Sequence, residues 1–309
     1  MAEFAHQPVM LDEIIESFMG LPSGVIVDAT LGGGGHAEAL LECREDFEVF
    51  GIDRDEHARA AAGQRLSRFG SRVRIVSGEF GQLKAVLAQH GVDHQGVKGM
   101  LFDLGVSSPQ LDRPERGFSY RFDAPLDMRM DMRQSLTADD VVNEYSEADL
   151  ASVIARYGEE KFAKPIARNI VAARPIVGTK ALVDCIYSAV PHGARRRGSH
   201  PARRTFQAIR MEVNRELPNL AEGLDDAVHL ISPGGRVAVL SYHSLEDRIV
   251  KKRFAAAAGT VTPYPVPPIQ ERSGFRLVTR GAQGPAAAEI ERNPRAESAK
   301  LRVIERIAE

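Results

Sequence analysis

The chain has 309 residues, 43% hydrophobic and 27% charged, a balance typical of folded globular proteins. Lysine plus arginine (40) nearly equals aspartate plus glutamate (42), so the overall charge indicates no polyanionic partner. No apolar run is long enough to span a membrane and the first residues lack a secretory pattern, so we expect a cytoplasmic protein. Cys43 and Cys185 match no zinc-ligand spacing, so we expect neither a disulfide framework nor a metal site.

The first hundred residues alternate short apolar runs with helical patterns. The predicted strands are 25–27, 47–52, 73–76 and 97–102. Helices are predicted between them, at 56–69 and 82–89 among others. This order is typical of strand–helix–strand units, so it predicts an α/β fold with a doubly wound parallel sheet.

The next convincing strand, at 236–240, follows the fourth by about 130 residues, far more than an ordinary crossover needs. The chain between them carries apolar residues at helical spacing. We therefore expect an inserted helical domain at 110–212, with the core formed by 1–109 and 213–309. Pro218 is predicted to divide the last helical run of this stretch into two helices.

Beyond the fifth strand, a helix is predicted at 245–258 and a proline-rich loop at 262–268. Two short strand-like runs follow, at 275–279 and 301–307. We expect them to close the sheet as a terminal hairpin with an antiparallel edge strand.

Four glycines at 32–35 lie directly between the first strand and a helix. They let the backbone approach a ligand, and the start of the helix offers unpaired N–H groups. Asp53, at the end of the second strand, is placed to bind ribose hydroxyls. The spacing also satisfies the G-x-G-x-x-G/A fingerprint, so nicotinamide dinucleotides and S-adenosylmethionine both remain candidate ligands. Phe80, after the third strand, is either an adenine contact or ordinary core.

Asp103 and the turn at Ser108 and Pro109 follow the fourth strand, at the edge where such sheets bind ligands. A carboxylate followed by a Ser-Pro turn is typical of methyltransferases that act on the amino groups of bases. The lone pair of a cytosine amine is delocalised into the ring, so acceptors must draw on its hydrogens before the nitrogen attacks a methyl sulfonium. Either Asp103 or the carbonyl groups of Ser108 and Pro109 are expected to orient the amine. His243, after the fifth strand, either accepts a proton or binds a backbone group.

Long segments of the chain resemble the MraW/RsmH family of ribosomal RNA small subunit methyltransferases. The segments are HQPVML from His6, DATLGGGGH from Asp28, GIDRD around Asp53, FDLGVSSPQLD around Asp103, RGFSYRFDAPLDMRMD from Arg116, RRTFQAIRMEVN from Arg203 and SYHSLEDRIVK from Ser241. The resemblance therefore runs nearly from end to end.

This resemblance implies a Rossmann-like class I S-adenosylmethionine methyltransferase fold with a helical insert. It also implies methylation of the N(4) amine of a cytidine in the decoding region of 16S rRNA, within the small ribosomal subunit, by direct transfer from S-adenosylmethionine. The cofactor-binding residues it implies are Gly33, Gly34, Gly35, His36, Asp53, Phe80, Asp103 and Gln110. The oligomeric state stays open, with a homodimer as one alternative.

Residues 192–216 hold seven arginines against two glutamates, which indicates either contact with RNA phosphates or an ordinary solvated face. The arginines and aromatic residues interleaved at 116–122 favour either stacking on unpaired bases or a hydrophobic plug. The predicted RNA-binding residues are Arg116, Phe118, Arg195, Arg196, Arg197, Arg203 and Arg204. Two rival classes remain: a nicotinamide oxidoreductase and a non-catalytic ribosome assembly factor.

Overall fold

The computed structural model describes residues 8–105, 113–195, 200–260 and 274–308. The chain divides into two compact units. Unit 1 comprises 1–105 together with 217–309, and unit 2 comprises 106–216. The insert is thus a few residues longer at each end than the 110–212 expected from sequence. The predicted proline-rich loop at 262–268 lies outside the described residues.

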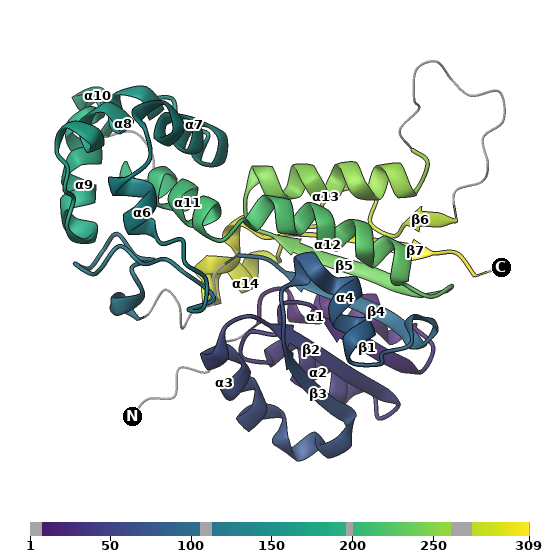
Figure 1. Cartoon of the computed structure of the whole chain (residues 1–309). Coiled ribbons are helices and arrows are strands. Elements are labelled where there is room, and N and C mark those ends of the chain that lie inside the picture. Colours follow the sequence, from purple (N-terminus) through teal and green to yellow (C-terminus); the bar gives the residue numbers. More distant parts are fainter. Residues whose placement is uncertain (1–7, 106–112, 196–199, 261–273, 309) are drawn as a thin grey trace. The chain divides into compact units, whose positions relative to one another are not determined.

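Unit 1 is built on a seven-stranded sheet with the order β3-β2-β1-β4-β5-β7-β6 (Figure 1). The strands are β1 (Gly24–Asp28), β2 (Phe47–Asp53), β3 (Val73–Ser77), β4 (Val97–Asp103), β5 (Arg236–Ser241), β6 (Phe275–Leu277) and β7 (Lys300–Arg306). Strands β1 to β5 are mutually parallel, which confirms the predicted α/β sheet. β7 runs antiparallel to both of its neighbours, β5 and β6.

The last two strands confirm the expected antiparallel edge strand. β6 is the edge of the sheet and runs antiparallel to β7, which lies between β5 and β6. Leu301, Val303 and Ile304 of β7 are almost completely buried. Three-residue β6 is only half-buried to exposed. The longer and more apolar strand therefore takes the internal position, where both of its faces are covered.

Helices cover both faces of the sheet. One face packs on α1 (Leu11–Met19), α2 (Gly35–Cys43) and α3 (Glu56–Leu66). The other face packs on α4 (Leu83–Gln89), α12 (Glu216–Leu230) and α13 (Ser244–Ala257). Phe18 and Leu40 are buried in the first layer, and Phe102 and Phe254 in the second. Two separate apolar layers therefore hold the parallel strands between them, as a doubly wound fold requires.

Three helical features differ from the sequence-based expectations. α1 and α14 (Ala287–Arg292) were not predicted. The break predicted at Pro218 falls earlier: α11 (Ala202–Val213) ends and α12 begins around Arg215, which has a left-handed φ of 48°. Pro218 lies in the first turn of α12, where its missing N–H costs nothing because the N–H groups of a first turn have no partner within the helix.

Unit 2 is helical, as the apolar spacing predicted. Its helices are α6 (Ala138–Asn143), α7 (Glu147–Gly158), α8 (Ala163–Ala172), α9 (Gly178–Ala189), α10 (His192–Arg195) and α11. Ile154, Ile166, Leu182 and Phe206 are buried in one core shared by four of them. Among the residues the structure describes, no helix of either unit is both long and apolar enough to cross a bilayer.

Candidate active site

The loop that joins β1 to α2 carries the glycines singled out in the sequence. Gly32 and Gly34 adopt left-handed φ values of 52° and 78°. A Cβ atom on Gly34 would lie 3.1 Å from Leu66 Cδ1, so a side chain there would press on α3. A Cβ on Gly33 would meet no atom within 4 Å. The loop thus packs on one side and presents bare backbone on the other, as a ligand-binding loop at a helix start does.

Three of the parallel strands end in an aspartate: Asp28 on β1, Asp53 on β2 and Asp103 on β4. β1 lies between the other two strands, so the three carboxyl ends meet at one edge of the sheet. Burial raises the pKa of Asp28 to about 7; a hydrogen bond from the Thr30 N–H opposes the rise, and the nearby Asp103 and Asp53 add to it. This carboxylate cluster forms a rim suited to a cationic ligand.

Asp53 lies where the sequence predicted a ribose-binding acid. Its Oδ2 accepts the Gly32 N–H at 2.8 Å, and its Oδ1 accepts the Asp55 N–H at 2.8 Å. Burial raises the pKa of Asp53, against the effect of these two hydrogen bonds. Asp53 therefore ties the end of β2 to the glycine loop, and its carboxylate remains at the rim.

Asp103 is held from two directions. Its backbone N–H donates to Thr30 Oγ1 at 2.6 Å, and its Oδ1 accepts the Tyr242 hydroxyl at 2.6 Å. Its Oδ2 lies 3.7 Å from Nδ1 of the buried His36. His36 Nε2 lies 2.9 Å from the Val9 carbonyl oxygen, which can only accept, so Nε2 carries the hydrogen. In neutral His36, the Nδ1 that faces Asp103 is consequently an acceptor.

Phe80 and His243 had two interpretations each. Phe80 is half-buried and meets Phe102 edge-on, with 5.9 Å between ring centroids, so it is part of the core and also partly open to a ligand. His243 is the N-cap of α13: its Nδ1 accepts the Glu246 N–H at 3.3 Å in a capping box. The structure therefore favours the backbone-binding interpretation of His243 over proton transfer.

Sequence reasoning gave no role to Asp28, Thr30 or Tyr242. Each had a usable signal in the sequence. Asp28 ends a strand, Thr30 belongs to the glycine-rich segment that follows it, and Tyr242 directly precedes His243. Ser108, Pro109 and Gln110 lie outside the described residues. Among the residues that are described, no cluster of three or more His, Cys, Asp or Glu side chains could hold a metal ion.

Arg116 and Phe118, predicted to meet RNA, are both buried in unit 2. The Phe118 ring packs within the unit 2 core. Arg116 Nη2 donates to the Arg129 carbonyl at 2.8 Å. The expected stacking of a base on Phe118 is therefore wrong, because the core already covers its ring, and the plug interpretation fits both residues.

The basic run at 192–216 separates into engaged and exposed arginines. Arg195 donates to the Val190 carbonyl at 2.6 Å and lies over the Tyr187 ring at 4.3 Å. Arg210 forms a bidentate pair with Glu216, with N–O distances of 2.7 and 2.8 Å. Arg203 and Arg204, at the start of α11, are exposed, and Arg204 Nη1 donates to the Glu159 carbonyl at 3.2 Å. Arg196 and Arg197 lie outside the described residues.

An aromatic pair lies close to these exposed arginines. Tyr120 and the exposed His200 are stacked, with 4.7 Å between ring centroids and 14° between planes, and Tyr120 also meets Phe206 edge-on. The His200 carbonyl accepts the Arg203 N–H at 3.0 Å. Tyr120 belongs to the same interleaved segment as Phe118, and its ring stacks on the exposed His200 whereas the Phe118 ring is buried.

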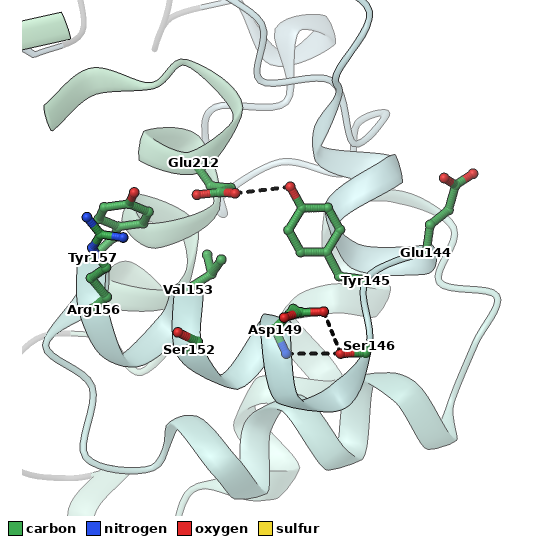
Figure 2. Close-up of a pocket in the computed structure, with 9 residues that line it drawn as sticks. All are labelled: Glu144, Tyr145, Ser146, Asp149, Ser152, Val153, Arg156, Tyr157 and Glu212. Carbon is green, nitrogen blue, oxygen red and sulfur yellow. Dashed lines mark hydrogen bonds between the residues drawn. The ribbon is translucent and has the colours of Figure 1, made fainter. Parts of the chain in front are cut away.

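A depression of about 560 Å³ in unit 2 is lined by α7, Glu212 and residues around Tyr145 (Figure 2). The Tyr145 hydroxyl donates to Glu212 Oε1 at 3.0 Å. Burial, followed by the hydrogen bond to Glu212, raises the pKa of Tyr145 to about 12. Glu144 and Asp149 add negative charge, against Arg156. An acidic lining repels phosphates, so this depression is not part of the predicted RNA surface.

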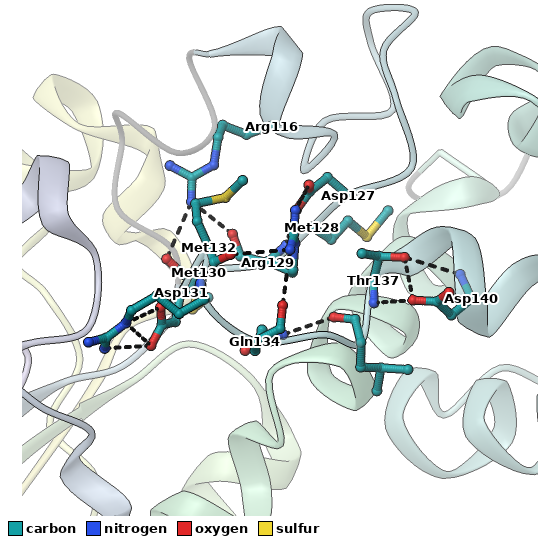
Figure 3. A network of polar contacts seen from close by, with 12 residues as sticks. Arg116, Asp127, Met128, Arg129, Met130, Asp131, Met132, Gln134, Thr137 and Asp140 are labelled. Carbon is teal, nitrogen blue, oxygen red and sulfur yellow. Dashed lines mark hydrogen bonds and ion pairs between the residues drawn. The ribbon is translucent and has the colours of Figure 1, made fainter.

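The irregular segment before α6 is held by a polar network (Figure 3). Arg129 donates to both carboxylate oxygens of Asp127, at 3.0 and 2.8 Å. The Asn214 side chain accepts the Met130 N–H and donates to the Met128 carbonyl. Thr137 and Asp140 form a capping box at the start of α6. The aspartates of this segment are thus bound to arginine or to backbone, which marks them as structural.

The MraW methylase family matches residues 3–307. A protein of Kocuria rhizophila named ribosomal RNA small subunit methyltransferase H is 49% identical over 100% of this chain and 96% of its own length. Proteins of the same name from Acidothermus cellulolyticus and Pseudarthrobacter chlorophenolicus are 48% and 50% identical, covering 98% and 92% of this chain and 94% and 87% of their own. The chain therefore belongs to the MraW methylase family.

Proposed function

We propose that this protein methylates the N(4) amine of a cytidine in the decoding region of 16S rRNA, within the small ribosomal subunit, with S-adenosylmethionine as methyl donor. The observation that carries the proposal is the carboxylate rim beside the glycine loop, in a chain that a methylase family matches over 3–307. The names of relatives about half identical to this chain support the ribosomal substrate. The proposal implies action in the cytoplasm, where small subunits are assembled.

The rim fits S-adenosylmethionine better than a nicotinamide dinucleotide. S-adenosylmethionine carries positive charge on its sulfonium and amino groups, whereas a dinucleotide carries an anionic pyrophosphate. Asp28, Asp53 and Asp103 meet at the rim, and burial holds the pKa of the first two above the ordinary range. A cation relieves that unfavourable burial, while a pyrophosphate would worsen it. The donor set therefore favours S-adenosylmethionine over the rival oxidoreductase ligand.

The residues proposed to hold the cofactor follow from this arrangement. The backbone of Gly33, Gly34 and Gly35 would approach it closely, and Asp53 would accept its ribose hydroxyls. The exposed side of Phe80 would face the adenine. His36 and Asp103 would face polar groups of the cofactor. Gln110, outside the described residues, stays a candidate from the family resemblance. When bound, the cofactor supplies an electrophilic methyl group.

Asp103 is proposed to orient the target amine. A carboxylate oxygen that accepts an amine hydrogen draws the nitrogen lone pair away from the ring and toward the methyl group. In the structure Oδ1 accepts the Tyr242 hydroxyl and Oδ2 lies toward His36. The carbonyl groups of Ser108 and Pro109 remain the alternative acceptors. No covalent intermediate between protein and pyrimidine is required.

For RNA, we propose that Arg203 and Arg204 contact phosphates and that the exposed His200 of the stacked pair supports an unpaired base. Histidine and tyrosine rings stack on bases of any sequence, and phosphate contacts position without specifying. Arg196 and Arg197 stay predicted phosphate contacts. Arg195 is partly committed to Val190 and Tyr187, so we expect it to contribute less.

The test is incubation of the purified protein with methyl-labelled S-adenosylmethionine and small subunits from cells lacking the modification, followed by nucleoside mass spectrometry. We expect label in N(4)-methylcytidine. Label in another nucleoside would overturn the target and keep the cofactor. Cofactor binding with no transfer to any subunit preparation would favour the non-catalytic assembly factor.

A further inference from the structure

We infer that Tyr242 is a positioning residue, which fixes the orientation of the Asp103 carboxylate through a hydrogen bond to its Oδ1. This inference rests on the proposed function for its catalytic meaning. It concerns a residue that neither the motif resemblance nor the glycine-loop chemistry singled out.

The contact joins the ends of two neighbouring strands. Asp103 is paired with Leu240 in the parallel register of β4 and β5, and the Leu104 N–H donates to the Leu240 carbonyl at 3.0 Å. Tyr242 lies two residues beyond that partner, where the chain has left the sheet. Its side chain reaches back across the edge, and its hydroxyl donates to Asp103 Oδ1 at 2.6 Å. Such a short bond to a carboxylate is of the strong, charge-assisted kind.

Tyr242 is itself fixed before it meets Asp103. Its backbone N–H donates to Glu246 Oε2 at 2.8 Å, within the capping box that starts α13. Glu246 is almost fully buried. The Tyr242 ring packs against the apolar layer of α1, α2 and α3. The position of the hydroxyl is therefore fixed at both the backbone and the ring of Tyr242. A residue that orients another side chain must itself be held in this way.

The two oxygens of Asp103 are thereby made different. Oδ1 is occupied by Tyr242, and the backbone N–H of the same residue is held by Thr30. Burial and the Asp103 carboxylate keep the pKa of Tyr242 well above 10, so the hydroxyl donates throughout the usual pH range. Rotation of the carboxylate would break this bond. The bond to Tyr242 consequently fixes which of the two oxygens lies toward His36: it is Oδ2, 3.7 Å from His36 Nδ1.

Tyr242→Phe tests the inference, because it removes one oxygen and retains the ring. We expect kcat for subunit methylation to fall roughly ten- to hundredfold, because small misplacements of reacting groups cause losses of this size. We expect the Kd for S-adenosylmethionine to change by much less than kcat, and the melting temperature to stay within the range of the wild type. Tyr242→Ala, which also loses the packing, should be less stable as well as less active.

The pH profile separates orientation from packing. Losing a hydrogen bond to the ionised carboxylate favours the protonated form, so the acid limb of the rate profile should move to higher pH in Tyr242→Phe. Asp28 and His36 also face Asp103, and Glu246 and Glu289 face Tyr242. These groups are unchanged in the variant, so they cannot by themselves produce the shift.

Tyr145→Phe is the matched control, since it removes the same kind of tyrosine-to-carboxylate bond, to Glu212 in unit 2. It should leave the pH profile in place. A Tyr242→Phe enzyme with wild-type kcat and profile would overturn the inference, as would a loss confined to cofactor Kd. NMR titration of carbon-13 labelled Asp103 needs no turnover: an unchanged midpoint in Tyr242→Phe would refute the positioning role even if the proposed reaction proved wrong.

Discussion

The aspartates at the strand ends of unit 1 differ in their surroundings from those around α6 in unit 2. In unit 1, Asp28 and Asp53 are buried at the strand ends, and burial raises the pKa of both. In unit 2, hydrogen bonds from Thr137 lower the pKa of Asp140, and Asp127 is bound bidentately by Arg129. Carboxylates that a fold has satisfied internally hold that fold together. Carboxyl groups whose burial is unfavourable in the free protein indicate a binding site for a ligand.

The largest expected effect, and the one that would most directly break this comparison, is on Asp103. Asp103→Asn keeps the shape but weakens the acceptor, and we expect methylation of small subunits to fall at least about a hundredfold. Asp127→Asn is the counterpart in unit 2 and should reduce the melting temperature with little effect on kcat. Equal losses of kcat in the two variants would contradict the assignment of Asp103 to the reaction and of Asp127 to the stability of the fold.

A second test uses pH and Asp28. Its pKa of about 7 in the folded protein lies above the ordinary 3.8, so the folded state holds a proton that the unfolded state has lost between these values. This contribution to the free energy of unfolding is fully present below pH 4 and declines as pH rises toward 7, by up to about 1.4 kcal/mol per pH unit.

Asp28→Asn cannot titrate, so the variant should gain stability relative to the wild type as pH rises from about 4 to 7 and keep that gain above 7. Urea melts at several pH values measure the difference. Parallel curves for the two proteins would contradict a raised pKa for the buried Asp28. If Asp28 contributes to binding a cation, S-adenosylmethionine should stabilise the wild type more than Asp28→Asn in the same urea melts.

A smaller effect is expected from the capping box of unit 2. Thr137→Ala removes the hydroxyl that accepts the Asp140 N–H, and losing such a cap costs about 1 kcal/mol. We expect a modestly lower melting temperature and an unchanged methylation rate at 25 °C. Thr137→Ser, which keeps the hydroxyl, should recover most of the loss. If Thr137→Ala is fully folded and its methylation rate is nevertheless much lower, this segment takes part in the reaction.

The smallest effect concerns salt. Each lost phosphate contact should make the log–log dependence of RNA affinity on salt shallower by about 0.7. Arg203→Ala and Arg204→Ala are therefore expected to reduce the slope singly and roughly additively in the double variant. Arg210→Ala is the contrast, because its guanidinium is bound to Glu216 and should not affect the slope. A wild-type slope near zero would contradict phosphate binding altogether.

The sequence predicted the sheet well because a buried parallel strand is a continuous apolar run with little else in it. The first five strands lie within a residue or two of their expected bounds, and the glycine loop and Asp53 lie where the motifs put them. Local chemistry fixed these features, so local sequence was enough to find them.

Features that depend on distant partners were harder to find. Tyr242 matters through its contact with Asp103, 139 positions away, which no local pattern records. Phe118 and Tyr120 share one aromatic segment, and only tertiary packing decides that the first is buried while the second stacks with His200. The internal position of β7 likewise depends on what β5 and β6 offer it, because sequence order does not fix strand order.

The place of β7 also has a consequence for biosynthesis. Unit 2 is one continuous stretch of chain that precedes β5, so all of its parts leave the ribosome before β5 does. Unit 1 remains open until the end, because β7, the last strand in chain order, pairs with both β5 and β6. Until residues 300–306 emerge, β5 presents an unpaired edge, the kind that invites pairing with a foreign strand. Nascent chains stalled before this point should therefore hold a folded unit 2 beside an aggregation-prone, incomplete unit 1.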